Sequence, residues 1–108
     1  MSSTLFTPYK LGPVTLRNRT IRSAAFESMG KDFGPTRQLK DYHVAVARGG
    51  VGMTTLAYAA VCRSGLSFNK QLWLRPEIVP GLREITDAVH REGAAAAIQI
   101  GHCGNMTH

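Results

Sequence analysis

Gln99 combines a residue type and a position that indicate ligand chemistry. It stands between Ile98 and Ile100, near the carboxyl end of an apolar run. In parallel α/β proteins, ligands bind at the carboxyl ends of the strands. A buried primary amide must be hydrogen bonded, and it offers both a carbonyl acceptor and NH2 donors. This dual character suits the mixed donor and acceptor edge of a flavin pyrimidine, and it equally suits an amide that bonds only to neighbouring backbone.

Two other groups of residues have types that could bind phosphate or metal. Gly49-Gly50-Val51-Gly52 is rich in glycine, but it leaves a helix and enters a strand, whereas a phosphate-binding loop runs from a strand into a helix. We interpret it as a helix end and a tight turn. His102, Cys103 and His108 are zinc-ligand types, yet their spacing does not match the usual two-plus-two pattern. We therefore expect no metal site.

Composition and charge exclude several classes of protein. The chain has 108 residues, of which 44% are hydrophobic, and this is enough for one small globular core. Its net charge of +6 is scattered, and the one dense group, Arg17, Arg19 and Arg22, lacks interleaved aromatic residues that could stack on bases. We therefore expect no nucleic-acid partner. No apolar run approaches the roughly 20 residues of a membrane helix. Two cysteines and no recognisable leader indicate a reducing cytoplasm.

The apolar patterning predicts an alternation of strands and helices. A hairpin is expected over residues 5–16, around Gly12-Pro13. Amphipathic helices are expected from Thr36 to Gly49-Gly50 and from Pro80 to Gly93, and we expect their histidines, His43 and His90, to be packing or surface residues. Strands are expected near residues 20–25, 51–58 and 94–100. Because parallel strands need crossover helices, this order predicts an α/β fold with a parallel sheet.

Several segments of the chain together carry a resemblance to a known family. They begin with Leu-Phe-x-Pro, continue with Leu-x-Asn-Arg before the first strand, and close with Gln-x-x-His-x-Gly. The segments are Leu5 to Gly12, Thr15 to Arg19, Ala47 to Gly52, Ile85 to Gly93 and Gln99 to Gly104. In this order, and over essentially the whole chain, they resemble the start of the Old Yellow Enzyme family of NADH:flavin oxidoreductases. The stretch Arg22 to Glu27 is similar to the branch near the 2,4-dienoyl-CoA reductase-like members.

The resemblance implies the amino-terminal portion of an FMN-dependent (β/α)8 TIM barrel, closed at the bottom by the hairpin from Tyr9 to Leu16. FMN would lie at the carboxyl ends of the strands, with NAD(P)H as the reductant and an activated alkene or similar small molecule as the acceptor. Three cofactor contacts carry over position by position. Ala24, Ala25 and Phe26 would meet the flavin ring partly through backbone groups, Tyr58 would lie beside its N5 and O4 edge, and Gln99 would bind its pyrimidine.

The chain departs from the family pattern at four of these positions or their neighbours. The family commonly has Thr, Cys or His where Phe26 stands, and an aromatic ring cannot donate the same hydrogen bond. It usually has a small residue where Tyr58 stands, so that backbone can approach the flavin. Cys103 and Asn105 stand where the family has Ala and Arg.

Length is the larger difference from the family. A barrel of this kind takes about 250 residues, and the resemblance places the substrate-holding donors, the proton donor and the phosphate loops on later strands. We therefore assign no catalytic residue to this chain. The run from Ala94 to Ile100 also lacks the charges or proline that guard an exposed edge, so we expect the rest of a barrel or a second copy to cover it. The alternative is a catalytically inert fragment or a small α/β binding module.

Overall fold

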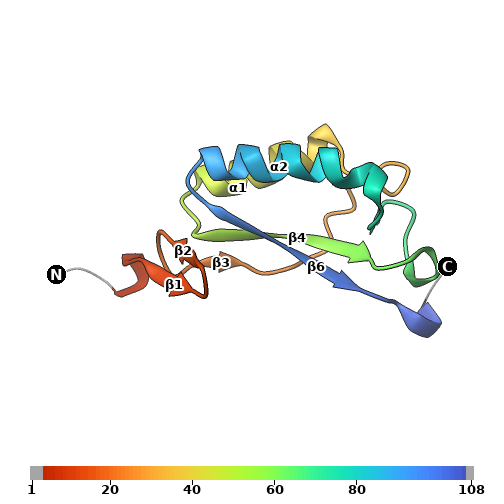
Figure 1. Ribbon diagram of the computed structural model, residues 1–108, viewed down its shortest axis with the longest axis horizontal. Coiled ribbons are helices and arrows are strands. Elements are labelled where there is room, and N and C mark those ends of the chain that lie inside the picture. The colour runs from red at the N-terminus through yellow and green to blue at the C-terminus, as the bar shows by residue number, and fades with distance from the viewer. Residues whose placement is uncertain (1–3, 107–108) are drawn as a thin grey trace.

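A parallel sheet built around one central strand forms the frame of the molecule (Figure 1). The structure is a computed structural model, and it describes residues 4–106. Strand β4 (Met53–Ala60) pairs in parallel with β3 (Ile21–Arg22), β5 (Leu72–Trp73) and β6 (Ala95–Gly101). Since Met53 pairs with both Ile21 and Ala95, β3 and β6 lie on opposite edges of β4. The prediction of an α/β fold with parallel strands is confirmed.

A short hairpin lies at the amino ends of the parallel strands (Figure 1). Strands β1 (Tyr9–Leu11) and β2 (Val14–Leu16) pair antiparallel, and Gly12 turns the chain with a φ of 59°. Glycine populates this left-handed region without a Cβ penalty. The hairpin residues are exposed except Leu16, which is 1% exposed. Because ligands bind at the carboxyl ends of parallel strands, the hairpin lies at the end of the sheet opposite the expected ligand site.

Both long helices cover the same face of the sheet (Figure 1). Helix α1 (Arg37–Arg48) begins after Thr36, whose hydroxyl oxygen accepts a hydrogen bond from the Leu39 N–H at 3.1 Å. Helix α2 (Val79–Arg91) begins with a proline in its first turn, where the missing N–H costs nothing. Gly50 and Gly93 follow the two helices with φ values of 104° and 87°. These start and stop signals are the ones that the sequence predicted.

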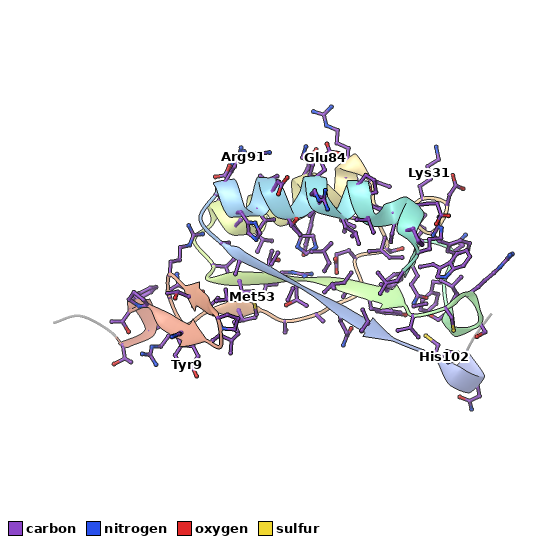
Figure 2. The ribbon with its side chains drawn as sticks, in the orientation of Figure 1. Tyr9, Lys31, Met53, Glu84, Arg91 and His102 are labelled. Atoms are coloured by element: carbon purple, nitrogen blue, oxygen red, sulfur yellow. The ribbon has the colours of Figure 1, made fainter. Side chains whose placement is uncertain are left out.

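The core lies between the helices and the sheet, where side chains fill the space in Figure 2. Its buried members come from both helices and three strand regions. They are Leu39, Ala47, Leu56, Ala59, Leu72, Ile85, Val89 and Ala94. Along β6, Ala96 and Ile98 also pack against this cluster, whereas Gln99, one residue after Ile98, is exposed. Because side chains alternate along a strand, Gln99 belongs to the opposite, uncovered face of the sheet.

The strand bounds differ from the expected ones in ways that have physical causes. The first strand is shorter than residues 20–25, because only Ile21–Arg22 pairs with β4 before the chain leaves the sheet. Near the end of β4, the edge that no longer pairs with β3 pairs instead with β5, a strand that the sequence did not predict. The other two strands run two residues and one residue later than expected, over 53–60 and 95–101.

The remaining elements are single turns of 3-10 helix at the ends of loops. They are Thr4–Phe6, Arg63–Gly65, Pro76–Ile78 and Gly104–Met106. Across the part of the chain that the structure describes, no helix has the length and apolar character needed to cross a membrane.

Candidate functional site

The loops that follow β3, β4 and β6 gather at one end of the molecule. Lys31 and His102, labelled in Figure 2, mark that end, and the hairpin with Tyr9 marks the opposite one. The strands of a parallel sheet point their carboxyl ends the same way, and ligands bind at that edge. The residues that the sequence proposed for a cofactor all lie on or just after these strands. This end of the sheet is therefore the candidate site.

The ladder between β4 and β6 is interrupted at the candidate site. Leu56 pairs with Ile98 and Ala59 pairs with Ile100, so two residues of β4, Ala57 and Tyr58, stand opposite Gln99 alone. The peptide bond between these two residues is cis. Bulges of this kind re-aim side chains and free backbone groups from the ladder. The structure thus brings Tyr58 and Gln99 together, two residues that the sequence assigned to one flavin site.

Phe26, in the segment after β3, contacts two aromatic rings on and after β4. Its ring centroid lies 5.0 Å from that of Tyr58 and 5.2 Å from that of Phe68. The Tyr58 hydroxyl lies 2.7 Å from Oγ of Ser67, and because Ser67 donates to Gln71, the Tyr58 hydroxyl is the donor. The Tyr58 ring is therefore held among its neighbours on the loop after β4.

Gln99 differs from the expectation in its burial. The sequence predicted a buried amide, whereas the structure exposes it and gives it no hydrogen-bond partner among residues 4–106. The reason is the uncovered face of the sheet, on which Ala95, Ala97 and Gln99 alternate with the core-facing residues. The burial prediction was wrong for this chain. The donor and the acceptor of the Gln99 amide are both unused and accessible. This removes the alternative of an amide bonded only to neighbouring backbone.

A buried carboxylate lies behind the bulge, and the sequence analysis missed it. Oε1 of Glu27 accepts hydrogen bonds from Nε2 of His43 at 2.8 Å and from the Ala57 N–H at 3.2 Å. On the far side of the ring, Nδ1 of His43 lies 2.7 Å from the Thr54 hydroxyl. His43 is thus a fully buried packing residue, as expected. The available signal was Glu27 directly after the apolar stretch 24–26, where an acidic side chain needs a partner.

Arg22 connects the first strand to the same carboxylate. Its Nη1 donates to the Thr55 carbonyl at 2.9 Å, and its Nη2 donates to the Tyr42 hydroxyl at 3.1 Å and lies 3.6 Å from Oε2 of Glu27. The guanidinium also stacks over the Tyr42 ring at 4.9 Å. These contacts explain the arginine in this short strand, because both terminal nitrogens of its half-buried guanidinium have partners on β4, on α1 or at Glu27.

The remaining proposed residues fit a flat, polar-edged ligand on the uncovered face. Ala25 is exposed and Ala24 is half-buried, so small side chains leave the backbone after β3 accessible. The Gln99 amide supplies an unused donor and acceptor on the uncovered face of the sheet. This donor set agrees with the chemistry of a flavin pyrimidine edge. The residues present therefore fit FMN as the ligand.

The histidine that follows β6 is engaged within the chain. Nδ1 of His102 accepts from the Gly104 N–H at 2.9 Å, and its Nε2 lies 3.2 Å from the Ser64 hydroxyl. The His102 ring packs closely on Gly65, since a Cβ added to Gly65 would lie only 2.8 Å from Cδ2 of His102. His108, another of the zinc-ligand types, lies outside the described residues, and residues 4–106 contain no cluster of three or more His, Cys, Asp or Glu side chains that could hold a metal.

Comparisons with known proteins give relatives along the whole segment. The chain is 48% identical over 100 residues to the 4,4'-dithiodibutanoate disulfide reductase of Rhodococcus erythropolis, covering 93% of this chain and 25% of that protein. It resembles the structure of morphinone reductase in complex with tetrahydroNAD, with a TM-score of 0.87 and 25% identity, over 99% of this chain and 29% of that one. Old Yellow Enzyme from Pichia sp. AKU4542 shares the fold, with a TM-score of 0.89 at 19% identity over 96% and 28% of the two chains.

This chain corresponds to only one part of each of these longer proteins. The chain spans less than a third of the length of each of these proteins, and the structural neighbours are barrels of which this sheet is a part. The family model for NADH:flavin oxidoreductase / NADH oxidase proteins matches residues 4–108. FMN and reduced nicotinamide, the cofactors of that family, are those that the resemblance implied. The chain therefore belongs to the NADH:flavin oxidoreductase / NADH oxidase family.

Proposed function

We propose that this chain supplies the amino-terminal part of the flavin site of an FMN-dependent NAD(P)H oxidoreductase. The observation that carries the proposal is the exposed, unbonded amide of Gln99 opposite the bulge at Ala57 and Tyr58. FMN, when bound, supplies the hydride chemistry between NAD(P)H and an activated alkene or similar acceptor. The protein's share is position and electrostatics.

Each proposed residue has a separate task at the site. Gln99 binds the pyrimidine edge of the flavin, donating and accepting at the same time. Ala24 and Ala25 let backbone approach the ring, and Phe26 with Tyr58 forms an aromatic wall beside it. Glu27 holds the Ala57 N–H and thereby fixes the backbone next to Tyr58. No residue of this chain is assigned a proton-transfer role.

The acceptor is proposed to be a small molecule that is reduced in the cytoplasm. An activated alkene is the acceptor that the resemblance implies. The relative from Rhodococcus erythropolis is named for a disulfide, and a disulfide is also reduced by two electrons. We therefore propose a small two-electron acceptor and distinguish these two classes by experiment.

A chimeric barrel tests the proposal. This chain would replace the segment that it matches in the Rhodococcus erythropolis relative, which restores a chain of full length. We expect the purified chimera to bind FMN and to oxidise NADH or NADPH when an alkene conjugated to a carbonyl, or 4,4'-dithiodibutanoate, is added. A folded chimera that binds no FMN would contradict the proposal. A chimera that binds FMN and reduces neither acceptor would contradict the acceptor class alone.

A further inference from the structure

A small pocket opens beside the loop that follows β4. Its volume is about 240 Å³, and its lining residues come from the loop after β3 and from the loop after β4. They are Phe33, Arg63, Leu66, Ser67, Phe68 and Asn69. None of them belongs to the residues proposed above for FMN. The pocket is below the roughly 300–1,000 Å³ of a complete ligand site, so its size suits one end of a ligand.

The walls of the pocket are fixed by hydrogen bonds from outside it. The Phe33 carbonyl accepts from the Trp73 N–H at 2.9 Å and from Nη1 of Arg75 at 3.0 Å. On the other wall, Oε1 of Gln71 accepts from the Ser67 N–H at 2.7 Å, and Gln71 is 1% exposed. The pocket is therefore formed before any ligand arrives, which lowers the ordering cost of binding.

Two donor side chains in the pocket have no partner within residues 4–106. The guanidinium of Arg63 makes no ion pair or hydrogen bond there, and neither does the amide of Asn69. By contrast, Arg22 and Arg75 are both engaged with carbonyl groups. A guanidinium presents paired N–H donors whose geometry matches a carboxylate. The unused donors of the pocket are thus suited to an organic anion.

The apolar part of the lining sets the rest of the ligand's chemistry. Phe33, Leu66 and Phe68 offer aromatic and aliphatic surface beside the two donors. A bare inorganic anion would leave that surface uncovered, whereas an acid with a short carbon chain would bury it. The lining therefore favours a carboxylate carried on an apolar chain.

The pocket is joined to the candidate flavin site through stacked rings. Phe68 lines the pocket and stacks on Phe26 at 5.2 Å, and Phe26 in turn contacts Tyr58 at 5.0 Å. The Phe68 ring therefore lies between the pocket and the aromatic pair Phe26 and Tyr58 of the candidate site.

We propose that this pocket is a subsite for the carboxylate end of a small organic acid. Arg63 and Asn69 bind the carboxylate, and Phe33, Leu66 and Phe68 contact the carbon chain. This part of the proposal rests on the proposed function: the acid is the substrate that this family member reduces, and its reacting bond lies beyond Phe26. The subsite itself needs no flavin, so its binding can be measured separately.

Direct binding of a simple acid tests the subsite. Butanoate would be titrated into the chain and followed by ligand-observed NMR, with the neutral isostere butanamide as the paired probe. We expect butanoate to bind and butanamide to bind more weakly, because only the acid gains charge-assisted hydrogen bonds. Arg63→Gln should weaken butanoate by about tenfold or more, and Arg63→Lys, which keeps the charge and loses the fork, should fall in between.

Matched controls separate the subsite from general charge effects. Arg83→Gln removes the same charge from an exposed position on α2 and should leave butanoate binding unchanged. Circular dichroism confirms that the variants keep the fold, as expected for the exposed Arg63. Equal binding of butanoate and butanamide, no binding of either, or an unchanged affinity in Arg63→Gln would overturn the subsite. FMN and butanoate titrations of the chimeric barrel tell the two proposals apart, since a folded chimera that binds butanoate but no FMN contradicts the proposed function alone.

Discussion

Nε2 of His43 lies 2.8 Å from Oε1 of Glu27, and the two side chains are 0% and 1% exposed. This contact joins α1 to the segment that follows β3. The same carboxylate oxygen accepts from the Ala57 N–H on β4. One buried group thus ties a helix, a strand end and the bulge opposite Gln99 into a single arrangement. It explains how the backbone of the candidate site is held without help from the uncovered face of the sheet.

Glu27→Ala should destabilise the chain strongly. It leaves the His43 and Ala57 donors buried and unpaired, at a cost of about 1–3 kcal/mol for each. Urea unfolding followed by circular dichroism measures the loss. Glu77→Ala is the control, because the Glu77 side chain is 73% exposed and lies 3.9 Å from Arg75. Equal stability of the two variants would show that the buried contact contributes nothing.

Arg17→Lys should lower stability although it keeps the charge. The Arg17 guanidinium donates to the carbonyl groups of Ala47, Val51 and Glu92 at 2.6, 3.1 and 2.7 Å. A lysine ammonium cannot reproduce this planar fork, so we expect a loss of about 1–3 kcal/mol in unfolding free energy.

The control for Arg17 is Arg91→Lys. Arg91 is exposed in the last turn of α2 and is labelled in Figure 2. Gly93→Ala should also lower stability, because the φ of 87° strains any residue with a Cβ and because that Cβ would meet Nη1 of Arg17 at 2.6 Å. If Arg17→Lys proves as stable as Arg91→Lys, the three carbonyl contacts do not hold the helix ends.

Thr36→Ala should remove the amino-terminal cap of α1. The Thr36 hydroxyl accepts from the Leu39 N–H and donates to the Met29 carbonyl, so its loss should cost about 0.5–2 kcal/mol. Thr86→Ala serves as the comparison, because the Thr86 hydroxyl only donates to the Arg83 carbonyl within α2. Thermal unfolding of the two variants should rank Thr36→Ala lower, and the reverse order would argue against the cap.

The isolated chain should self-associate through the unpaired edge of β6 and the exposed apolar side chains of its sheet. Ile21 and Ile100 are 49% and 54% exposed, and within residues 4–106 strand β6 pairs only with β4. Exposed apolar surface and an unpaired edge promote association. Sedimentation should show mass that rises with concentration, and Ile100→Lys should reduce it. A monomer at all concentrations with a sharp thermal transition would refute this expectation.

Much of the frame was predictable because its signals are local. Thr36 and Gly50 mark the ends of α1, and the apolar runs around Leu56 and Ile98 mark two of the strands. Strand β5 was not predictable in this way, since two residues carry no periodicity and their pairing depends on the edge that β3 leaves free. The order and parallel direction of the longer strands followed from the crossover helices.

The candidate site was predictable as a set of positions but not as an environment. Gln99 was singled out by its type and place, yet its exposure depends on which face of the sheet the helices cover. The Glu27 and His43 contact was missed because it joins residues 16 positions apart through the fold. Pairings of this kind leave only weak traces in one sequence, such as an acidic residue at the end of an apolar stretch.

The binding of FMN to the Gln99 amide is the central claim, and a flavin fluorescence titration of the chimeric barrel tests it most directly. Gln99→Leu keeps the side chain's size and removes both donor and acceptor, so it should cost about 1–3 kcal/mol, or roughly five- to 150-fold in FMN affinity. Gln99→Glu should weaken FMN at least as much, because a carboxylate would face carbonyl acceptors. Gln38→Leu, at an exposed position on α1, should bind FMN like the parent. Unchanged affinity in both Gln99 variants would contradict the account.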